Sequence, residues 1–362
     1  MDQSIVPHVG VDLGDAKSHV CALDPATGEI VSESVVPTTR PELARVFAAM
    51  PRCVILMETG THSSWVARLL AAQGHKVTVA HARRLRIVSE NLRKSDRTDA
   101  HILAMLAASP VNLVKAVVVR SAQTQELAAV VRARDLAVQT RSKLAVGAKG
   151  FVKAAGARLP GSQPEALPRR AWDLVPADLC SAVRPLLLLI AQMTRTIRGY
   201  DREIKRICAE LRPETKRLTQ VHGVGEVTAL AYVLSIESAS RFARSRDVGA
   251  FLGLVPAKNQ SGRSNPKLGI SKNGDALVRR LLVQCAHQIL RKASPDTALK
   301  RWGLAYIERH GKGSRKAAAT AVARKLAVLL HALWTSGAAY EPLRNGAPAA
   351  KAGRSRGKRS AA

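Results

Sequence analysis

Acidic and aromatic side chains are scarce in this chain of 362 residues. It has 27 Asp and Glu against 57 Lys and Arg, a formal net charge of +30, and only 3% of its residues are aromatic. A charge of that sign and size indicates a polyanionic partner. The scarcity of Phe, Tyr and Trp argues against base stacking on aromatic platforms as the main mode of binding.

Paired cysteines and long apolar segments are also missing. Five cysteines are scattered without a C-x-x-C pair, which argues against a zinc site and predicts a reducing, cytoplasmic compartment. The most apolar stretch, 185–192, is far too short to span a bilayer, and the N-terminus lacks the pattern of a signal peptide. We therefore expect no membrane partner.

What the chain does contain begins with a predicted mixed α/β domain over residues 1–120. Turn signals and apolar runs predict strands at 8–13, 18–23, 30–35, 54–57 and 76–80, with helices at 41–50 and 63–72. Strands in hairpin order, followed by strands alternating with helices, are typical of a mixed sheet. With acids at the strand ends, this order resembles the RNase H and Holliday-junction-resolvase fold.

Four carboxylates in this region form a candidate metal site. Asp12 lies at the end of a predicted buried strand and Glu58 directly follows another, while Asp96 and Asp99 stand three residues apart where a helical pattern begins. On a helix, residues i and i+3 lie on one face. Carboxylate oxygens are the ligands that Mg²⁺ prefers, and such ions assist phosphoryl transfer. The alternative for Asp96 is an ordinary helix N-cap.

A basic run leads up to the acid pair. As a solvated face it would be unremarkable, but beside a metal site it would hold a nucleic-acid backbone. Its candidate contacts are Arg83, Arg84, Arg86, Arg93, Lys94 and Arg97.

Residues 121–212 predict two long helices separated by a Pro- and Gly-rich break. In the second helix, apolar residues from Leu186 to Leu211 alternate spacings of four and three, the pattern of a coiled-coil seam. We favour an intermolecular coiled coil, and therefore a homo-oligomer. The alternative is packing within a helical hairpin of the same chain.

Residues 213–340 predict a mainly α-helical domain. Gly223 and Gly225 lie between two short apolar helices, the pattern of a helix-hairpin-helix whose backbone N–H groups meet phosphate; a plain turn is the alternative. The loop 253–274 is rich in Gly, Ser and Asn and has no acids. Its basic residues are Lys258, Arg263, Lys267 and Lys272. Residues 341–362 predict a disordered basic tail.

Taken in order, the motifs V-G-V-D, M-E-T-G, K-S-D-R-T-D-A, G-V-G, F-L-G-L-V-P and L-G-I-S-K-N-G-D resemble those of DEDD-type insertion-sequence transposases. This is the insertion-sequence one-ten family of bacterial recombinases guided by a bridge RNA. The resemblance covers roughly residues 5–335. It implies a resolvase-like domain, a coiled-coil insert that forms a dimer or tetramer, and a C-terminal transposase domain.

The resemblance also implies roles for individual residues. Asp12, Glu58, Asp96 and Asp99 match the family's four metal-binding acids, which would hold Mg²⁺ or Mn²⁺. Ser261 would be the nucleophile, with Ser264 as the alternative, attacking double-stranded DNA to form a 5′-phosphoserine link. The serine would then work with the acids of another subunit, on nucleoid DNA in the cytoplasm.

Two other functions are compatible with the residues. A metal-dependent nuclease or junction resolvase would use the same acids with water as the nucleophile. A non-catalytic architectural protein would account for the positive charge but leaves the four acids unexplained.

Overall fold

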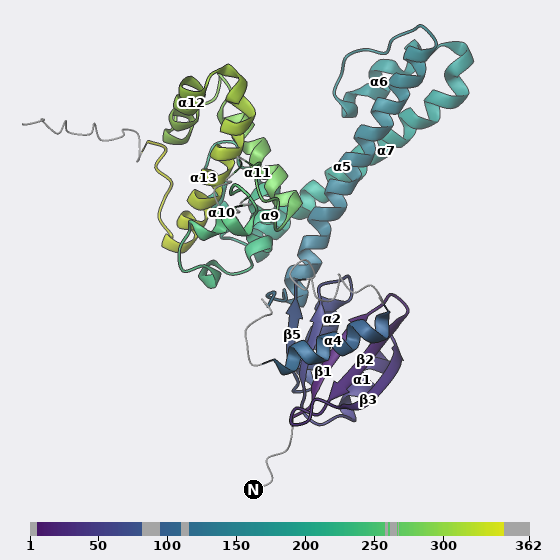
Figure 1. Cartoon of the computed structure of the whole chain (residues 1–362). Coiled ribbons are helices and arrows are strands. Elements are labelled where there is room, and N and C mark those ends of the chain that lie inside the picture. The colour runs from purple at the N-terminus through teal and green to yellow at the C-terminus, as the bar shows by residue number, and fades with distance from the viewer. Residues whose placement is uncertain are drawn as a thin grey trace, which may run out of the picture. The chain divides into compact units, whose positions relative to one another are not determined.

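The computed structural model describes residues 6–81, 95–109, 116–257, 260, 266 and 268–343. The chain divides into two compact units, Met1–Ala122 and Gln123–Ala362 (Figure 1). Of the predicted basic tail, residues 344–362 lie outside the described part.

Unit 1 is built on a five-stranded mixed sheet. Its strands are β1 (His8–Leu13), β2 (Lys17–Leu23), β3 (Ile30–Pro37), β4 (Val54–Glu58) and β5 (Lys76–Ala80). Its helices are α1 (Arg40–Ala48), α2 (Ser63–Ala72) and α4 (Asp96–Ala108). The strand order is β3-β2-β1-β4-β5. The β1–β2 and β2–β3 pairs are antiparallel, and the β1–β4 and β4–β5 pairs are parallel. The mixed sheet predicted from the sequence is thereby confirmed.

Helices cover both faces of this sheet. On one face, Val9, Val11 and Ile55 pack against α1 and α2, which contribute Phe47 and Leu70. On the opposite face lies α4 alone among the described helices (Figure 1). Its apolar residues Ala100, Ile102, Leu103 and Ala104 pack against Cys21, Leu23, Leu56 and Ala80.

Helix α4 sits directly on the backbone of β1 at Gly10. A Cβ atom at this position would lie 2.0 Å from the Ala100 carbonyl oxygen and 2.3 Å from the Ala104 nitrogen. Both atoms belong to the backbone of α4, so they cannot move aside as the end of a flexible side chain could. The glycine of V-G-V-D is therefore a packing residue: it lets α4 approach the strand that carries Asp12.

Unit 2 is helical. Its α-helices are α5 (Ala122–Ala154), α6 (Leu167–Ala171), α7 (Cys180–Arg206), α8 (Thr215–Leu218), α9 (Glu226–Ile236), α10 (Asp247–Phe251), α11 (Ala276–Ile289), α12 (Ala298–His310) and α13 (Arg315–Ser336). Short 3-10 helices occur at Pro164–Ala166, Trp172–Leu174, Ala177–Leu179, Ala239–Arg241 and Lys312–Ser314, and a π-helical turn at Ile207–Leu211 extends α7.

Helices α5, α6 and α7 form a hairpin with its own apolar core. Ala148 and Val152 of α5 pack with Leu187 and Ile190 of α7. Ile190, Ile197, Ile204 and Ile207, four residues of the predicted seam, are at most 4% exposed within the single chain. Ile190 packs in the hairpin core, and Ile204 and Ile207 pack in the core of the bundle, so packing within the single chain uses much of this seam. An intermolecular coiled coil stays a prediction.

The rest of unit 2 is a helical bundle around α9. Every residue of α9 from Thr228 to Ile236 is buried. At its centre Tyr232 is fully buried, and its hydroxyl donates a hydrogen bond of 2.6 Å to the Ala327 carbonyl of α13. Burial raises the pKa of Tyr232 well above its ordinary value.

Two segments, Ala177–Leu211 and Lys312–Ser336, have the length and hydropathy of a membrane span. The second contains α13, a core helix of the bundle, and the first contains α7, whose apolar side packs in the hairpin. Buried core helices of soluble proteins meet the same criterion of length and hydropathy, so these segments are only weak evidence for a membrane span.

Candidate active site

Asp12 and Glu58 lie on one face and at one edge of the sheet. Strands β1 and β4 are parallel neighbours with Gly10 opposite Leu56, so their carboxyl ends meet at the same edge. Side chains alternate along a strand, so Asp12 shares a face with Gly10 and Glu58 shares a face with Leu56. Leu56 packs against α4. Both carboxylates therefore lie on the face that α4 covers.

The first turn of α4 carries the other two acids. Ser95 is the N-cap, because its Oγ accepts a hydrogen bond of 3.2 Å from the Thr98 N–H; the N-cap alternative for Asp96 is wrong. Asp99 is only 6% exposed, and its Oδ1 finds no hydrogen-bond donor in the described part of the chain. Such an unsatisfied buried group costs roughly 1–3 kcal/mol, a cost that a bound cation would remove.

His19 connects α4 to the strand that carries Asp12. The two residues are directly opposite in the β1–β2 ladder, and His19 Nε2 lies 3.8 Å from Asp96 Oδ2. Side chains directly opposite in an antiparallel pair are neighbours. His19 therefore lies between Asp12 and Asp96, and the acid pair of α4 is placed near the end of β1.

The four carboxylates lie on the same face of the sheet, near the carboxyl ends of β1 and β4, but they do not surround a single point. Among the described residues, no group of three or more His, Cys, Asp and Glu side chains has the spacing of a metal centre. All four donors are carboxylates, which suit Mg²⁺ and Mn²⁺, and Asp99 offers an oxygen without a donor. The chemistry of the set therefore fits a hard divalent cation.

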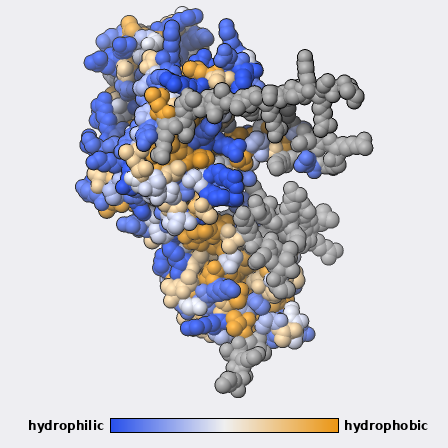
Figure 2. Space-filling view, turned by 90° about the vertical axis from the view of Figure 1, so that its left-hand side faces the viewer, coloured by the Kyte–Doolittle hydropathy of each residue, from blue (hydrophilic) through white to orange (hydrophobic). Residues whose placement is uncertain are grey.

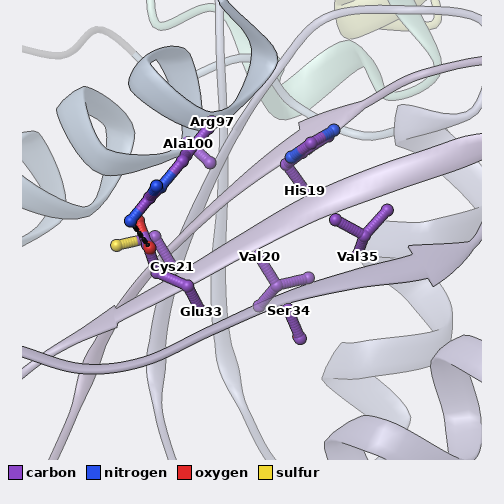
Figure 3. A pocket seen from close by; sticks show the side chains of 8 residues that line it. All are labelled: His19, Val20, Cys21, Glu33, Ser34, Val35, Arg97 and Ala100. Atoms are coloured by element: carbon purple, nitrogen blue, oxygen red, sulfur yellow. Dashed lines mark hydrogen bonds and ion pairs between the residues drawn. The ribbon is translucent and has the colours of Figure 1, made fainter.

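A cavity of about 260 Å³ adjoins these acids, between α4 and the strands β2 and β3 (Figure 3). In it the Arg97 guanidinium of α4 reaches the Glu33 carboxylate of β3 and forms a hydrogen-bonded ion pair. The hydrogen bond from Arg97 lowers the pKa of Glu33, and the same bond raises the pKa of Arg97. Arg97, predicted from sequence as a nucleic-acid contact, thus has a carboxylate partner within the protein.

Cys21 lies beside this ion pair (Figure 3). It is 1% exposed, and burial, reinforced by the charge of Glu33, raises the pKa of its thiol to about 11. The thiol therefore stays protonated near neutral pH and is unreactive.

Sequence reasoning did not single out His19 or Glu33. The signal that could have found them is strand register. In the β1–β2–β3 meander His19 is opposite Asp12, and Glu33 is opposite Cys21 on the same face. A hairpin register traced from Asp12 would have placed both residues beside α4.

The loop predicted to carry the nucleophile has a firmly held base in unit 2. The Ala257 N–H donates to the Gly269 carbonyl at 2.8 Å, and Pro256 and Ile270 form an antiparallel bridge. The predicted residues Lys258, Ser261, Arg263, Ser264 and Lys267 lie outside the described residues.

Beyond this base the chain makes a tight turn into α11. Lys272 has φ of 55° and Gly274 has φ of 72°, and a Cβ on Gly274 would lie 2.0 Å from the Phe251 carbonyl oxygen. Asp275 then caps α11 by accepting hydrogen bonds from the Leu277 and Val278 N–H groups. The motif K-N-G-D is thus a turn and a helix cap.

Two family models match the chain, one described as a transposase over residues 9–154 and one as the Transposase IS116/IS110/IS902 family over residues 215–301. The chain belongs to this transposase family. The family's members cut and rejoin DNA, and the resemblance noted from the ordered motifs is confirmed.

Curated relatives of this transposase match over most of its length. The transposase of insertion sequence element IS1111A from Coxiella burnetii is 29% identical, covering 92% of this chain and 90% of its own. That of IS1328 from Yersinia enterocolitica is 27% identical, covering 92% and 98%. A probable family 20 transposase from Pseudomonas aeruginosa is 28% identical, covering 84% and 90%.

The glycines predicted to meet phosphate in this transposase occupy different settings. Gly223 has φ of 87° and packs against α11, where a Cβ would lie 3.2 Å from the Cys285 carbonyl oxygen. This geometry agrees with the turn alternative. Gly225 is exposed at the N-terminus of α9 with open space around it, although Glu226 adds a negative charge in the first turn.

Most of the transposase's positive charge lies in unit 2, which carries 43 Lys and Arg against 16 Asp and Glu. Hydrophilic residues cover much of the surface on the face shown in Figure 2. In unit 1, the predicted contacts Arg83, Arg84, Arg86, Arg93 and Lys94 lie outside the described residues.

Proposed function

We propose that this transposase cuts and rejoins DNA with a divalent cation held by Asp12, Glu58, Asp96 and Asp99. The observation that carries the proposal is the shared edge: the ends of β1 and β4 and the first turn of α4 present all four acids on one face of the sheet. The cation would be Mg²⁺ or Mn²⁺, and when bound it would neutralise charge on the phosphate under attack.

In this proposal Ser261 is the nucleophile. Its Oγ attacks the phosphorus of a DNA phosphodiester; the Oγ–P bond forms, the bond from phosphorus to the 3′ oxygen breaks, and that oxygen leaves as a 3′-hydroxyl. The serine proton goes to a base or to water, since a hydroxyl is a weak nucleophile without such help. The described ends of the loop are paired with each other, and the loop 253–274 contains no acid that could serve as that base.

Serine and acids belong to different compact units of the chain. We propose that the acids of one subunit act with the serine of another, in a dimer or tetramer. Double-stranded DNA is the substrate, and a bridge RNA selects the sites. The basic unit 2 offers the charge for both nucleic acids.

The decisive experiment measures strand cleavage and strand transfer in the presence of Mg²⁺, on DNA that carries one end of the insertion sequence. Replacing any of the four acids by its amide should abolish both reactions. Ser261→Ala should abolish cleavage and the covalent protein–DNA species that is seen on a denaturing gel and removed by protease, with Ser264→Ala as the matched control. A Ser261→Ala protein that still cuts DNA would favour the nuclease that uses water.

Mixing tests the shared site. An Asp99→Asn protein mixed with a Ser261→Ala protein should recover strand transfer that neither has alone. In a mixed oligomer, the intact acids of the Ser261→Ala subunit can act with the intact serine of the Asp99→Asn subunit. No recovery after mixing or co-expression would contradict the shared site. Copurification of a discrete non-coding RNA with the wild-type protein tests RNA guidance.

A further inference from the structure

Helix α4 is held in place at two points along its length. Its middle rests on β1, where Ala100 and Ala104 leave no room for a side chain at Gly10. Its first turn, which carries Asp96 and Asp99, lies beyond that contact. Helix ends fray more readily than helix centres, so the position of the two acids depends on what holds this turn.

Arg97 reaches sideways from this turn across the sheet. Its partner Glu33 lies on β3, an edge strand that is separated from β1 by β2. Strands are spaced about 4.8 Å apart, so the ion pair ties the turn to a point about 10 Å to one side of the strand beneath α4. A tie at that distance resists rolling of the helix about its own axis.

The sequence positions make this sideways tie relevant to the acids. Successive residues are about 100° apart around a helix, so Asp99 lies roughly 200° from Arg97 and points to the opposite side. Arg97 points toward β3 through its ion pair with Glu33, and Asp99 is only 6% exposed. Rolling of the turn would swing both Asp96 and Asp99 away from the ends of β1 and β4.

We infer that the Arg97–Glu33 ion pair is a positioning device that sets the first turn of α4, and with it Asp96 and Asp99, relative to Asp12 and Glu58. This inference rests on the proposed function of the four acids. It assigns Arg97 to the alignment of the metal site and adds its partner Glu33, a residue of the edge strand β3 that is not one of the four acids. Displacements of about 1 Å at a reacting centre lower rates markedly, so a small loosening should be measurable.

Glu33→Gln is the variant that separates this role from DNA binding. It removes the ion pair while leaving the Arg97 cation available for a phosphate. If Arg97 is a positioning residue, Glu33→Gln should raise the Mn²⁺ dissociation constant and the Mg²⁺ concentration for half-maximal cleavage by about threefold, the scale expected for an ion pair whose Arg97 side chain is 73% exposed. If Arg97 only contacts DNA, both values should stay unchanged and DNA affinity should rise or stay the same.

Two further variants complete the test on the full-length protein. Glu29→Gln removes the same charge from the same β-hairpin without an ion pair and should behave as wild type. The charge swap Glu33→Arg with Arg97→Glu restores the pair in reverse and should recover the wild-type Mn²⁺ affinity. A swap that behaves no better than Glu33→Gln would overturn the inference.

Amide hydrogen exchange in the first turn of α4 supplies a readout that needs neither metal nor activity. Exchange should be faster in Glu33→Gln and normal in the swap and in Glu29→Gln. Unchanged exchange together with unchanged Mn²⁺ binding would overturn the positioning role. A wild-type protein that neither binds Mn²⁺ nor cuts DNA would instead refute the proposed function, while exchange would still report on the tie.

Discussion

The two regions that carry the proposed chemistry are held in different ways. In unit 1 the four acids lie on strands and a helix, and α4 contacts the backbone of β1 at Gly10. In unit 2 the predicted nucleophile lies in a loop whose two ends are paired, Ala257 with Gly269. The first region places its groups on regular elements, whereas in the second the described residues show the pairing of the two points where the loop leaves and returns.

The difference suits the role proposed for each region. Metal ligands need fixed spacing, because several oxygens must meet at one point, and strands and helices give that precision. A nucleophile that meets a long polymeric substrate needs reach as well as position, and binding residues are often placed on loops for that reason. Substitutions that loosen each region should therefore have different effects.

The largest effect is expected at the contact between α4 and β1. Gly10→Ala places a Cβ about where the Ala100 carbonyl oxygen now lies, so α4 must move away from the sheet. Overpacking of this kind costs about 1–3 kcal/mol, and the shift also displaces Asp96 and Asp99. We expect reduced stability of unit 1 in denaturant unfolding and loss of cleavage.

Gly60→Ala is the matched control for that substitution, because a Cβ there meets nothing within 4 Å. Its unfolding midpoint should stay within experimental error of wild type. A Gly10→Ala protein with wild-type stability and activity would show that α4 does not depend on the bare backbone of β1.

A similar loss of stability, but a smaller loss of activity, is expected at the base of the loop 253–274, which carries the proposed nucleophile. Gly274→Ala combines a left-handed φ of 72° with a Cβ 2.0 Å from the Phe251 carbonyl oxygen. We expect a loss of about 1–3 kcal/mol in the stability of unit 2 and a fall in formation of the covalent protein–DNA species, while Mn²⁺ binding by unit 1 is retained. Gly269→Ala, where a Cβ meets open space, should leave both unchanged.

The smallest effect is a pH dependence confined to the bundle. His331 is 1% exposed, its Nε2–H donates to the Ala239 carbonyl, and its Nδ1 accepts from the Ser245 hydroxyl. Burial lowers the pKa of His331 below 6.5. Between the folded-state pKa and 6.5 the unfolded chain binds more protons, so stability should fall as the pH drops through this window.

Unfolding of unit 2 measured from pH 7.5 to pH 5 should therefore show a decline that His331→Gln makes shallower. The exposed residue His310 of α12 provides the matched substitution. Equal slopes in His331→Gln and wild type would exclude His331 as a source of the decline.

Much of unit 1 could be predicted from sequence because its signals are local. Strand β1 has the predicted bounds His8–Leu13, and the apolar runs before Glu58 and Ala80 predict β4 and β5 to within a residue. Acids at the ends of parallel strands meet at one edge whatever the rest of the chain does. The placement of Asp12 and Glu58 at strand ends therefore followed from the sequence, whereas the pairing of β1 with β4 came from the structure.

The contributions of His19 and Glu33 could not be predicted in the same way. The partners Arg97 and Glu33 are 64 residues apart in sequence, and their meeting depends on the register of β2 and β3 and on the direction in which α4 crosses the sheet. Charge composition alone assigned Arg97 to a nucleic acid. The seam of α7 was similarly ambiguous, because a spacing of four and three does not say which helix covers it.

The paired ends of the loop 253–274 bring its entry and exit points together. Pro256 and Ile270 form a backbone bridge, and the turn at Gly274 directs the chain into α11, so a change of length between the bridged residues leaves both ends where they are. Doubling the length of a flexible loop costs only about 0.6 kcal/mol in closure entropy. Loops of altered length that keep Ser261 can therefore be engineered at this position.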